Sequence, residues 1–381
     1  MTGSRTTRRG YARRMKTFPC LAAGVSLAAA FVPGLAWAQS EPAVLYGRLN
    51  VALESMQNSR DAQARSASVA RESNDRSVIG LRGAEDLGDG VQALFQVEGT
   101  LAPDTGAGSP AARDTRVGVA TPYGTLFGGN WVTPYNGATA GLDPFYPTTA
   151  GYMSIMGNGS APTTDNVIDT SSFDRRQQNS VHYWSPDWHG VVLRVAQGLN
   201  EEHPANGARP ALSSFAAIYE RGPLYLTAAY ERHHDYQGPG LNDTGSKIGA
   251  AWNIGTTRVA AIAERLRYAT RAGTLSRTSY YASVSHQMGA QAVHLAVGHA
   301  GDGQGGGSVG RIGYIAAGAG TGATHYTAGW DYAFSKRTSV FFYYTRLQND
   351  RNGVYDFGIN ALGAAAGATL KGSALGLRHN F

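Results

Sequence analysis

The stretch SVIGLRGAEDLGDGVQALFQVEG, residues 77–99, contains two segments in which apolar and polar residues alternate. In the first segment Ile79 and Leu81 lie on one face and Arg82 lies on the other. The glycine-rich run at 86–90 between the segments is typical of a tight turn. The second segment alternates in the same way, and its apolar face is formed by Val91, Ala93, Phe95 and Val97. Alternation on both sides of a tight turn predicts an antiparallel β-hairpin with one apolar and one polar face.

The same alternation recurs along the chain. Sixteen strands are predicted, at 43–54, 77–83, 91–99, 113–120, 124–132, 176–184, 190–199, 213–221, 224–232, 246–254, 257–267, 278–287, 291–300, 323–333, 339–348 and 373–381. Short turns such as TPYG and NIGT alternate with long loops, which are 55–75, 101–112, 133–175, 200–212, 233–245, 268–277, 301–322 and 349–372. This pattern predicts an all-β fold, a sixteen-stranded antiparallel transmembrane β-barrel with short periplasmic turns and long external loops. A soluble sandwich would need apolar residues on both inner faces.

The two faces of the predicted strands differ as a membrane barrel requires. Aromatic residues recur on the apolar face, at Tyr183, Tyr230, Trp252, Tyr280, Trp330, Tyr332, Phe342 and Tyr344. Such rings favour the boundary between hydrocarbon and lipid headgroups. The opposite face carries charges, among them Arg48, Glu98, Arg194, Glu231, Lys247, Glu264, Asp331 and Arg378. Charges at this frequency do not suit a dry core. They suit a water-filled lumen, which sixteen strands are enough to enclose.

Residues 1–38 are expected to be a cleaved secretory signal peptide, which leaves the barrel at 39–381. A basic stretch precedes an apolar run that closes with Ala36-Trp37-Ala38, and either Met1 or Met15 could be the start. Without this leader the 33 basic residues fall to 27, equal to the 27 acidic residues. Nucleic acid is therefore not a favoured partner. The single cysteine, Cys20, also belongs to the leader, which excludes disulfides and cysteine-ligated metals from the predicted barrel.

Six stretches in chain order resemble the trimeric sixteen-stranded general porins of β-proteobacterial outer membranes. They are LYGRLNVALE (45–54), IGLRGAEDLGDGVQALFQVE (79–98), YGTLFGGNWVTPY (123–135), FDRRQQNSVHYWSPDWHG (173–190), DYAFSKRTSVFFYYTRLQN (331–349) and GLRHNF (376–381). The resemblance covers the whole of 39–381. It implies a homotrimer in outer-membrane lipid and lipopolysaccharide, assembled by the barrel-assembly machinery. It also implies passive passage of small hydrophilic solutes and ions, without a cofactor.

The resemblance implies that the third loop, 133–175, folds into the barrel and that its acidic residues face basic residues on the wall. Candidate residues of the constriction and lumen are Arg48, Arg82, Glu98, Arg116, Asp143, Arg176, His182 and Arg194. Basic residues outnumber acidic ones on the predicted lumen face, which predicts a weak anion preference that the loop acids could reverse. Val78, Asn130 and His182 stand where many relatives carry a basic residue, so the sign of the ion selectivity stays open.

The last predicted strand places Leu375, Leu377, His379 and Phe381 on its outward face. Pairing of this strand with the first would close the barrel without a free edge. The resemblance further implies that a terminal phenylalanine in this pattern is a signal for barrel assembly. We therefore predict that these four residues form the assembly signal of the chain.

Other functions stay open at this stage. They are a substrate-specific channel, an outer-membrane barrel enzyme, and a plugged barrel with a structural or adhesive role. No enzyme is predicted, because no Ser-His-Asp set or carboxylate pair has a catalytic spacing. The HHD run at 233–235 is not predicted to bind metal. Two glycine-rich runs within 301–310 match a nucleotide-binding spacing, but they are predicted to be surface loop because no strand and helix flank them.

Overall fold

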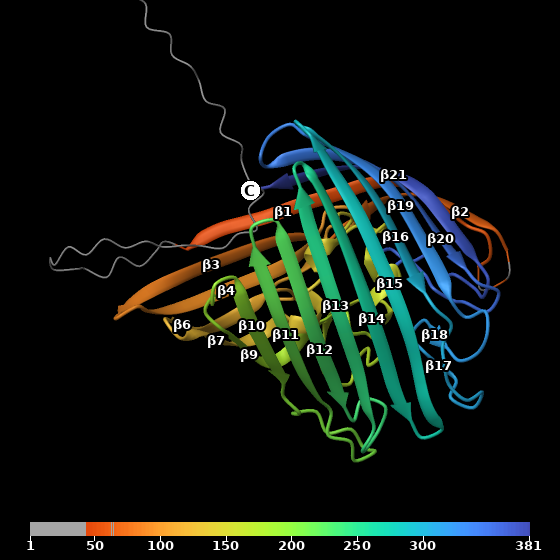
Figure 1. Cartoon of the computed structure of the whole chain (residues 1–381), viewed down its shortest axis with the longest axis horizontal. Coiled ribbons are helices and arrows are strands. Elements are labelled where there is room, and N and C mark those ends of the chain that lie inside the picture. The colour runs from red at the N-terminus through yellow and green to blue at the C-terminus, as the bar shows by residue number, and fades with distance from the viewer. Residues whose placement is uncertain (1–42, 62, 64) are drawn as a thin grey trace, which may run out of the picture. The chain divides into compact units, whose positions relative to one another are not determined.

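The computed structural model describes residues 43–61, 63 and 65–381. The chain divides into two units, 1–37 and 38–381. The predicted signal peptide lies outside the described residues, and the second unit is the barrel drawn in Figure 1. No helix in the described part of the chain is long and apolar enough to cross a membrane, a finding that concerns helices alone.

The barrel wall consists of sixteen strands, one of which is split in two. They are β1 (Val44–Asn58), β2 with β3 (Ala67–Asn74 and Ser77–Gly88), β4 (Val91–Ala102), β6 (Thr115–Thr121), β7 (Gly124–Val132), β9 (Arg175–Trp184), β10 (Val191–Gly198), β11 (Ala211–Arg221), β12 (Leu224–His234), β13 (Asn242–Ile254), β14 (Thr257–Thr270), β15 (Gly273–Met288), β16 (Gln291–Ala300), β19 (Ala323–Ala333), β20 (Thr338–Asn349) and β21 (Thr369–Asn380). β2 and β3 pair with successive halves of β1, and Arg76, with a φ of 58°, separates them. Four short strands lie in loops: β5 (Ala107–Ser109), β8 (Ala161–Thr164), β17 (Arg311–Ile312) and β18 (Ile315–Ala316).

The barrel closes where β1 pairs with β21. The register runs antiparallel from Arg48 opposite Asn380 to Asn58 opposite Leu370. The backbone N–H of Phe381 donates to the carbonyl oxygen of Gly47, and the Gly47 N–H donates to the Phe381 carbonyl oxygen, both at 3.0 Å. With neighbouring wall strands paired antiparallel all the way around, no wall strand is left with a free edge. The predicted sixteen-stranded antiparallel barrel is confirmed.

The predicted lengths of two external loops are wrong. The segment 268–277 is a tight turn between Thr270 and Gly273, because β14 and β15 continue almost to their junction. Most of 55–75 is also strand, belonging to β1 and β2. At the ends of β14 and β15 the outward residues, such as Arg267 and Ser276, are polar, whereas Tyr268 and Leu275 are buried inside. The alternation of apolar residues outside and polar residues inside is therefore lost. The short turns gather at the upper left of Figure 1, and the longer loops lie at the bottom and right.

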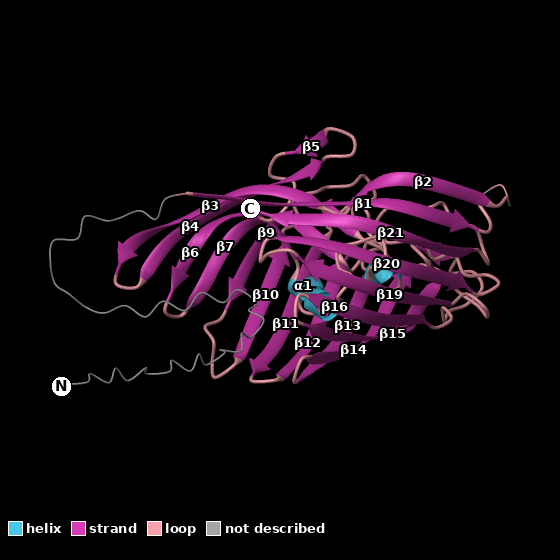
Figure 2. Cartoon of the chain, turned by 90° about the horizontal axis from the view of Figure 1, so that it is seen from above, coloured by secondary structure: helices cyan, strands magenta, loops and turns pink. Residues whose placement is uncertain are grey.

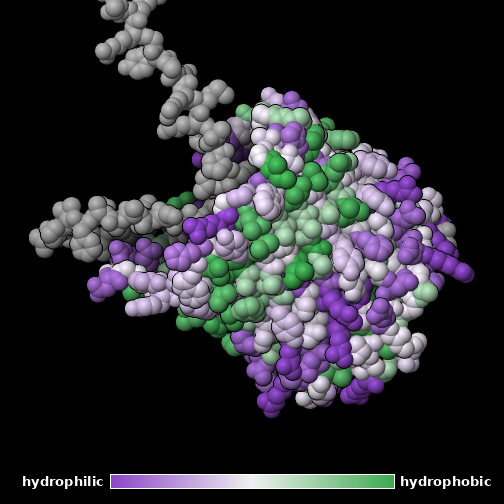
Figure 3. Space-filling model, viewed as in Figure 1, coloured by the Kyte–Doolittle hydropathy of each residue, from purple (hydrophilic) through white to green (hydrophobic). Residues whose placement is uncertain are grey.

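The outward face of the wall is apolar and the inward face is polar. Leu53 and Leu375 on the outside are 65% and 53% exposed, whereas the neighbouring Glu54 inside is buried. The predicted aromatic residues Tyr183, Tyr230, Trp252, Tyr280, Phe342 and Tyr344 are also exposed on the outside. Figure 3 shows the resulting apolar band across the outer face of the strands, with hydrophilic residues at both ends. In Figure 2 the short helices lie behind the magenta strands.

Candidate functional site

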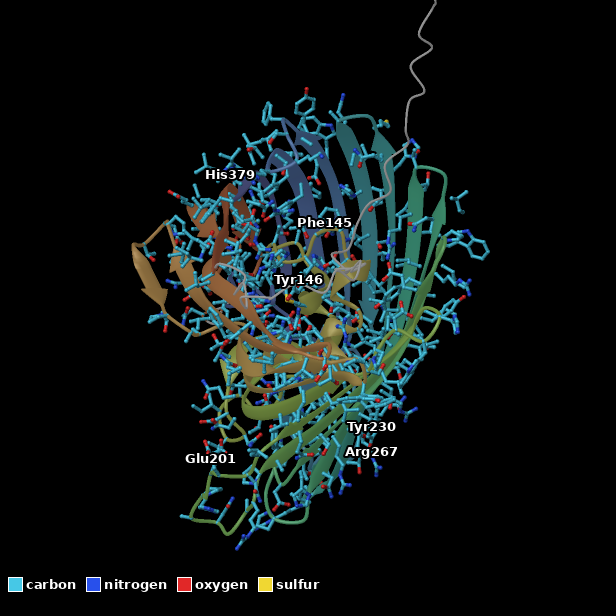
Figure 4. All side chains as sticks on the ribbon, turned by 90° about the vertical axis from the view of Figure 1, so that its left-hand side faces the viewer. Phe145, Tyr146, Glu201, Tyr230, Arg267 and His379 are labelled. Carbon is cyan, nitrogen blue, oxygen red and sulfur yellow. The ribbon has the colours of Figure 1, made fainter. Side chains whose placement is uncertain are left out.

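The third loop, between Val132 and Arg175, lies inside the barrel. It contains α1 (Pro134–Gly137), three single 3-10 turns (Ala140–Leu142, Tyr152–Ser154 and Met156–Asn158) and β8. The Thr133 hydroxyl accepts a hydrogen bond from the Asn136 N–H at 3.3 Å and so caps α1. In Figure 4, Phe145 and Tyr146 lie on this loop within the ring of strands. The inward fold of the loop, predicted by resemblance, is therefore observed.

Glycines on the wall make room for apolar side chains of the loop. A Cβ atom on Gly249 of β13 would lie 2.7 Å from Cδ1 of Leu142. A Cβ atom on Gly329 of β19 would lie 2.5 Å from Cε1 of Phe145. Carbon atoms in contact prefer a separation of about 3.5–4.0 Å, so any other residue at either position would displace the loop.

Hydrogen bonds also hold the loop against β12, β15 and β19. The hydroxyls of Tyr225, Ser283 and Thr327 donate to the loop carbonyls of Ala138, Leu142 and Ala150 at 2.6, 2.8 and 3.2 Å. These donors project from the inward face of widely separated strands. These bonds attach the third loop to the β12–β19 side of the lumen.

Glu264 on β14 is the charged centre of this attachment. Its carboxylate accepts hydrogen bonds from the Tyr135 hydroxyl and the Gly157 N–H, both at 2.8 Å. It also forms ion pairs with Arg277 at 3.0 Å and with Lys247 at 3.5 Å. All three charged side chains are buried. One wall carboxylate therefore holds the start and the middle of the loop.

Asp143, predicted to face the basic residues, bonds elsewhere. Its oxygens accept hydrogen bonds from the N–H groups of Phe145 and Tyr152, at 2.9 and 2.7 Å, and from the Tyr281 hydroxyl at 2.5 Å. The carboxylate therefore shapes its own loop and binds it to β15. Asp143 accordingly forms no ion pair with an arginine among the described residues. Asp165 likewise accepts N–H groups of its own turn, at Val167 and Ile168.

Five arginines project into the lumen from the other side of the barrel, and we call them the basic wall. They are Arg48, Arg82, Arg116, Arg194 and Arg378, on β1, β3, β6, β10 and β21. None of the five forms an ion pair with a carboxylate among the described residues. Arg48 donates to the Arg76 carbonyl oxygen at 2.9 Å, and Arg82 lies 5.1 Å from the ring centre of Tyr46. The basic wall therefore presents guanidinium groups that no carboxylate contacts in a direct ion pair.

Arg116 and Arg194 are held by aromatic rings instead of acids. The Arg116 guanidinium lies 4.4 Å from the ring centre of Trp131, 4.8 Å from that of Phe127 and 5.3 Å from that of Trp184. Arg194 lies 4.6 Å from the Trp184 ring. This cluster spans β6 to β10.

His182 belongs to the same aromatic cluster. Its ring stacks on Phe127 with centres 4.9 Å apart, and its Nε2 lies 2.9 Å from the Ser180 hydroxyl oxygen. Fully buried in this stack, the imidazole supports the ring beneath Arg116 rather than facing the lumen.

Two further predicted site residues have charged partners. Glu98 pairs with Arg113 at 2.9 Å and accepts the Tyr46 hydroxyl at 3.0 Å. Arg176 pairs with Asp114 at 2.8 Å. No role was predicted for Arg113 or Asp114, although both belong to a polar run at 113–116. Both pairs neutralise charge that had been expected to face the pore.

The other inward carboxylates of the wall strands predicted from sequence also have side-chain partners, of which the two histidines carry charge only when protonated. Glu54 pairs with Arg71 at 2.8 Å, Glu231 with His233 at 2.9 Å, and Asp331 with His294 at 3.1 Å. Together with Glu98 and Glu264, each of these five carboxylates has a basic partner. The arginines of the basic wall form no such pair and therefore add positive charge to that side of the lumen.

Arg76 is a site residue that the sequence analysis missed. Its Nη1 donates to the Tyr146 hydroxyl at 3.1 Å, and its Nη2 bonds the Ser160 hydroxyl. Arg76 thus connects the third loop to the side of the barrel that carries the basic wall. Its position in the break between β2 and β3 gave no alternation signal, so only the tertiary contact identifies it.

Comparison with known proteins agrees with this architecture. The sequence model of the Gram-negative porin family matches residues 24–352. The chain belongs to this family. The porin is accordingly an outer-membrane protein and a passive diffusion channel.

Individual relatives cover most of the porin. Outer membrane porin protein 32 of Delftia acidovorans is 25% identical over 316 residues, 80% of this chain and 84% of that protein. Major outer membrane protein P.IB of Neisseria meningitidis serogroup B is 28% identical over 222 residues, 56% of this chain and 60% of that protein.

Solved structures share the fold. The anion-selective porin from Comamonas acidovorans superposes with a TM-score of 0.74 at 22% identity, covering 90% of this porin and 100% of that chain. OmpT of Vibrio cholerae, solved in a trimer form, gives a TM-score of 0.61 at 13% identity, covering 89% of this porin and 99% of that chain.

The predicted assembly residues of the porin lie at the barrel seam. Leu375, Leu377 and Phe381 are exposed on the outward face. The His379 ring lies 6.5 Å from that of Phe381, and its Nδ1 lies 2.9 Å from the Thr338 hydroxyl oxygen. These contacts give the residues a place in the wall, and their role in assembly stays a prediction.

The two histidines of the HHD run lie apart in the porin. His233 stacks between Phe173 and Tyr236, with ring centres at 4.1 and 4.3 Å. His234 bonds Asn242 on the neighbouring strand. Among the described residues, no group of three His, Cys, Asp or Glu side chains is placed to hold a metal ion.

Proposed function

We propose that this porin is a general diffusion channel that prefers small anions and carries out no chemical step. The observation that supports the preference is the basic wall, whose five arginines have no carboxylate partner among the described residues. The third loop is bonded to β12, β15 and β19 on the opposite side of the barrel, so on this proposal solutes pass between the loop and these arginines. In a lumen with low-dielectric walls, unpaired charges of one sign raise the local concentration of counter-ions.

Two further observations support this proposal. Arg82 is exposed and Arg116 is partly exposed, so solutes in the lumen can reach both guanidinium groups. A protein of the same fold is named an anion-selective porin. The constriction, on this proposal, lies between Arg82, Arg116 and Arg194 on the wall and the open part of the loop around Gly141 and Tyr146.

The test is the reversal potential of the purified porin in a planar bilayer with a salt gradient. The wild-type value should indicate anion preference, and the double variant Arg82→Gln with Arg116→Gln should shift it toward cations. A matched control, Arg265→Gln with Arg267→Gln, removes the same charge from the outward face of β14 and should leave the potential unchanged. Cation preference in the wild type, or an equal shift in both variants, would overturn the proposal.

We infer that the porin is a homotrimer that associates through the outer face of β3–β7. The aromatic residues that mark lipid interfaces are concentrated on β9–β20, whereas the exposed large apolar residues on β3–β7 are mostly aliphatic. They include Ile79, Leu81, Val97, Val117, Val119 and Leu126, and Phe95 is the aromatic exception. A trimer form of a protein with the same fold supports this inference.

Cysteine crosslinking tests the association. In a background with Cys20→Ser, a single cysteine at Val117 on β6 should be crosslinked between copies by a short bifunctional maleimide. The control is a cysteine at Leu295 on β16, which is similarly exposed and outward. Trimer crosslinks at Leu295 but not at Val117 would place the interface elsewhere. Monomers alone in both variants would contradict the inferred trimer.

A further inference from the structure

Three arginines stand on the outside of the barrel at the external ends of β12 and β14, and we call them the arginine rim. They are Arg232, Arg265 and Arg267, and all three are exposed. Arg232 and Arg267 share one cross-strand row, on either side of Thr244 of β13. Two strand spacings put their backbones roughly 10 Å apart. Arg265 is the next outward residue along β14, and Figure 4 labels Arg267 beside Tyr230 at this end of the strands.

The charges of the arginine rim have no counter-ion among the described residues. Arg232 donates to the side-chain oxygen of Asn242 at 3.2 and 3.0 Å, and Arg267 donates to the Thr274 hydroxyl at 3.4 Å. Both acceptors are neutral. The rim therefore carries three unneutralised positive charges where the strands leave the apolar band.

The acidic residues at the external ends of β12 and β13 are occupied by other donors. Asp235 accepts the N–H groups of Gly240 at 2.7 Å and Arg209 at 2.9 Å. Asp243 accepts the Ala269 N–H at 2.9 Å. Neither carboxylate forms an ion pair with the arginine rim, so the three guanidinium groups remain available to an external anion.

An apolar hollow of about 740 Å³ lies in the outer wall directly below the rim. Going down β14, the outward residues are Arg267, Arg265, Ala263 and Ala261. Ala228 and Ala250 on the neighbouring strands extend this alanine surface, and Leu226 and Ile248 stand beside it. We call this depression the alanine hollow. It lies within the apolar band that Figure 3 shows over these strands.

The hollow faces hydrocarbon, because the porin spans the outer membrane and this face carries aromatic residues typical of lipid contact. A gap in a packed apolar surface loses dispersion contacts, and a flexible chain that fills it restores them. An acyl chain in the hollow would place its polar headgroup level with Arg265 and Arg267. Guanidinium groups bind phosphate with short, charge-assisted hydrogen bonds.

We propose that the arginine rim and the alanine hollow form one binding site for a phosphorylated lipid of the outer leaflet. The phosphate binds Arg232, Arg265 and Arg267, and one acyl chain lies over Ala261 and Ala263. The proposal rests on the outer-membrane location of the porin and is independent of the ion preference of its pore. The site lies on β12–β14, away from the face inferred to join the three copies.

The first test measures binding of purified lipopolysaccharide to the folded porin in a zwitterionic detergent by native mass spectrometry. Each basic residue near a lipid surface contributes about 1 kcal/mol, so Arg265→Gln with Arg267→Gln should weaken binding about 30-fold. The control, Arg221→Gln with Arg337→Gln, removes two exposed arginines from the periplasmic end and should bind as the wild type does. Equal binding by both double variants would overturn the proposal.

A second test separates the lipid from its phosphate alone. Ala261→Phe fills the hollow without changing charge, and it should weaken binding of intact lipopolysaccharide but not of the deacylated form. Competition by inorganic phosphate as strong as by intact lipid would overturn the role of the hollow. Loss of the trimer in the Arg265/Arg267 variant would show a contact between copies instead. Conductance and reversal potential, measured on the same preparations, should stay at wild-type values. Failure of the lipid-site proposal is therefore distinguishable from failure of the pore proposal.

Discussion

The guanidinium carbon of Arg116 lies 4.4 Å from the ring centre of Trp131, and no carboxylate pairs with it among the described residues. A cation over an aromatic face is stabilised by about 0.5–2 kcal/mol, depending on how far it is desolvated. An acidic partner would fix the arginine equally well but would cancel its charge. The aromatic cluster therefore holds a positive charge in place on the lumen wall while leaving that charge to act on solutes.

Trp131→Leu should reduce the anion preference without removing any charge. The guanidinium of Arg116 would lose one face of its support and adopt several positions, so its field at the constriction would weaken. The reversal potential should move toward cations by less than it does in Arg116→Gln. Trp252→Leu, on the outward face, is the matched control. A reversal potential of Trp131→Leu equal to that of the wild type would show that the Trp131 ring has no role in ion selectivity.

Glu264→Gln should loosen the third loop and destabilise the barrel by about 3 kcal/mol. The amide keeps the shape of the carboxylate but leaves Lys247 and Arg277 buried without a counter-charge. Urea unfolding in detergent would measure the stability, and single-channel recordings should show larger current fluctuations. Glu72→Gln, which removes an exposed carboxylate from β2, should change neither quantity. Quiet channels of wild-type stability in Glu264→Gln would show that the loop is held by its other contacts.

Gly329→Ala should push the loop toward the basic wall. The new methyl group would overlap Phe145, and the overpacking should cost about 1–3 kcal/mol and lower the single-channel conductance. Adding Phe145→Ala should restore both values, because the methyl group then has space. Gly128→Ala is the control, since its Cβ would meet no atom closer than 3.7 Å. Failure of the second substitution to rescue the first would show that the strain lies in the strand itself.

The positions of the strands could be predicted from the sequence because a membrane wall imposes alternation on every segment that crosses it. The prediction of strand ends was wrong where the strands extend beyond the membrane and this constraint no longer applies. The ends of β14 and β15, from Tyr268 to Arg277, extend beyond the apolar band, and 268–277 was therefore predicted to be a loop. The inward positions of Arg48, Arg82 and Arg116 could be predicted because alternation decides which face of a strand a residue occupies.

The partners of the site residues could not be predicted in this way. Glu98 meets Arg113 from the loop just before β6, and Asp143 meets Tyr281 of β15, which lies 138 residues later in the chain. Such contacts depend on how the loop folds inside the barrel, and strand periodicity carries no information about that path. The acidic residues of the loop suggested charges facing the pore, whereas Asp143 is used to hold the loop together.

Deletion of Phe381 should reduce the yield of assembled porin more than the conductance of each folded pore. The deletion removes the two backbone hydrogen bonds with Gly47, each worth about 1 kcal/mol, and the ring that covers Gly47 at the seam. Phe381→Leu keeps both bonds and an apolar side chain, so it separates seam stability from recognition of the aromatic ring. If the ring is an assembly signal, Phe381→Leu should assemble poorly in cells yet refold normally in detergent. Wild-type amounts of folded trimer in cells that express the deletion would contradict both roles.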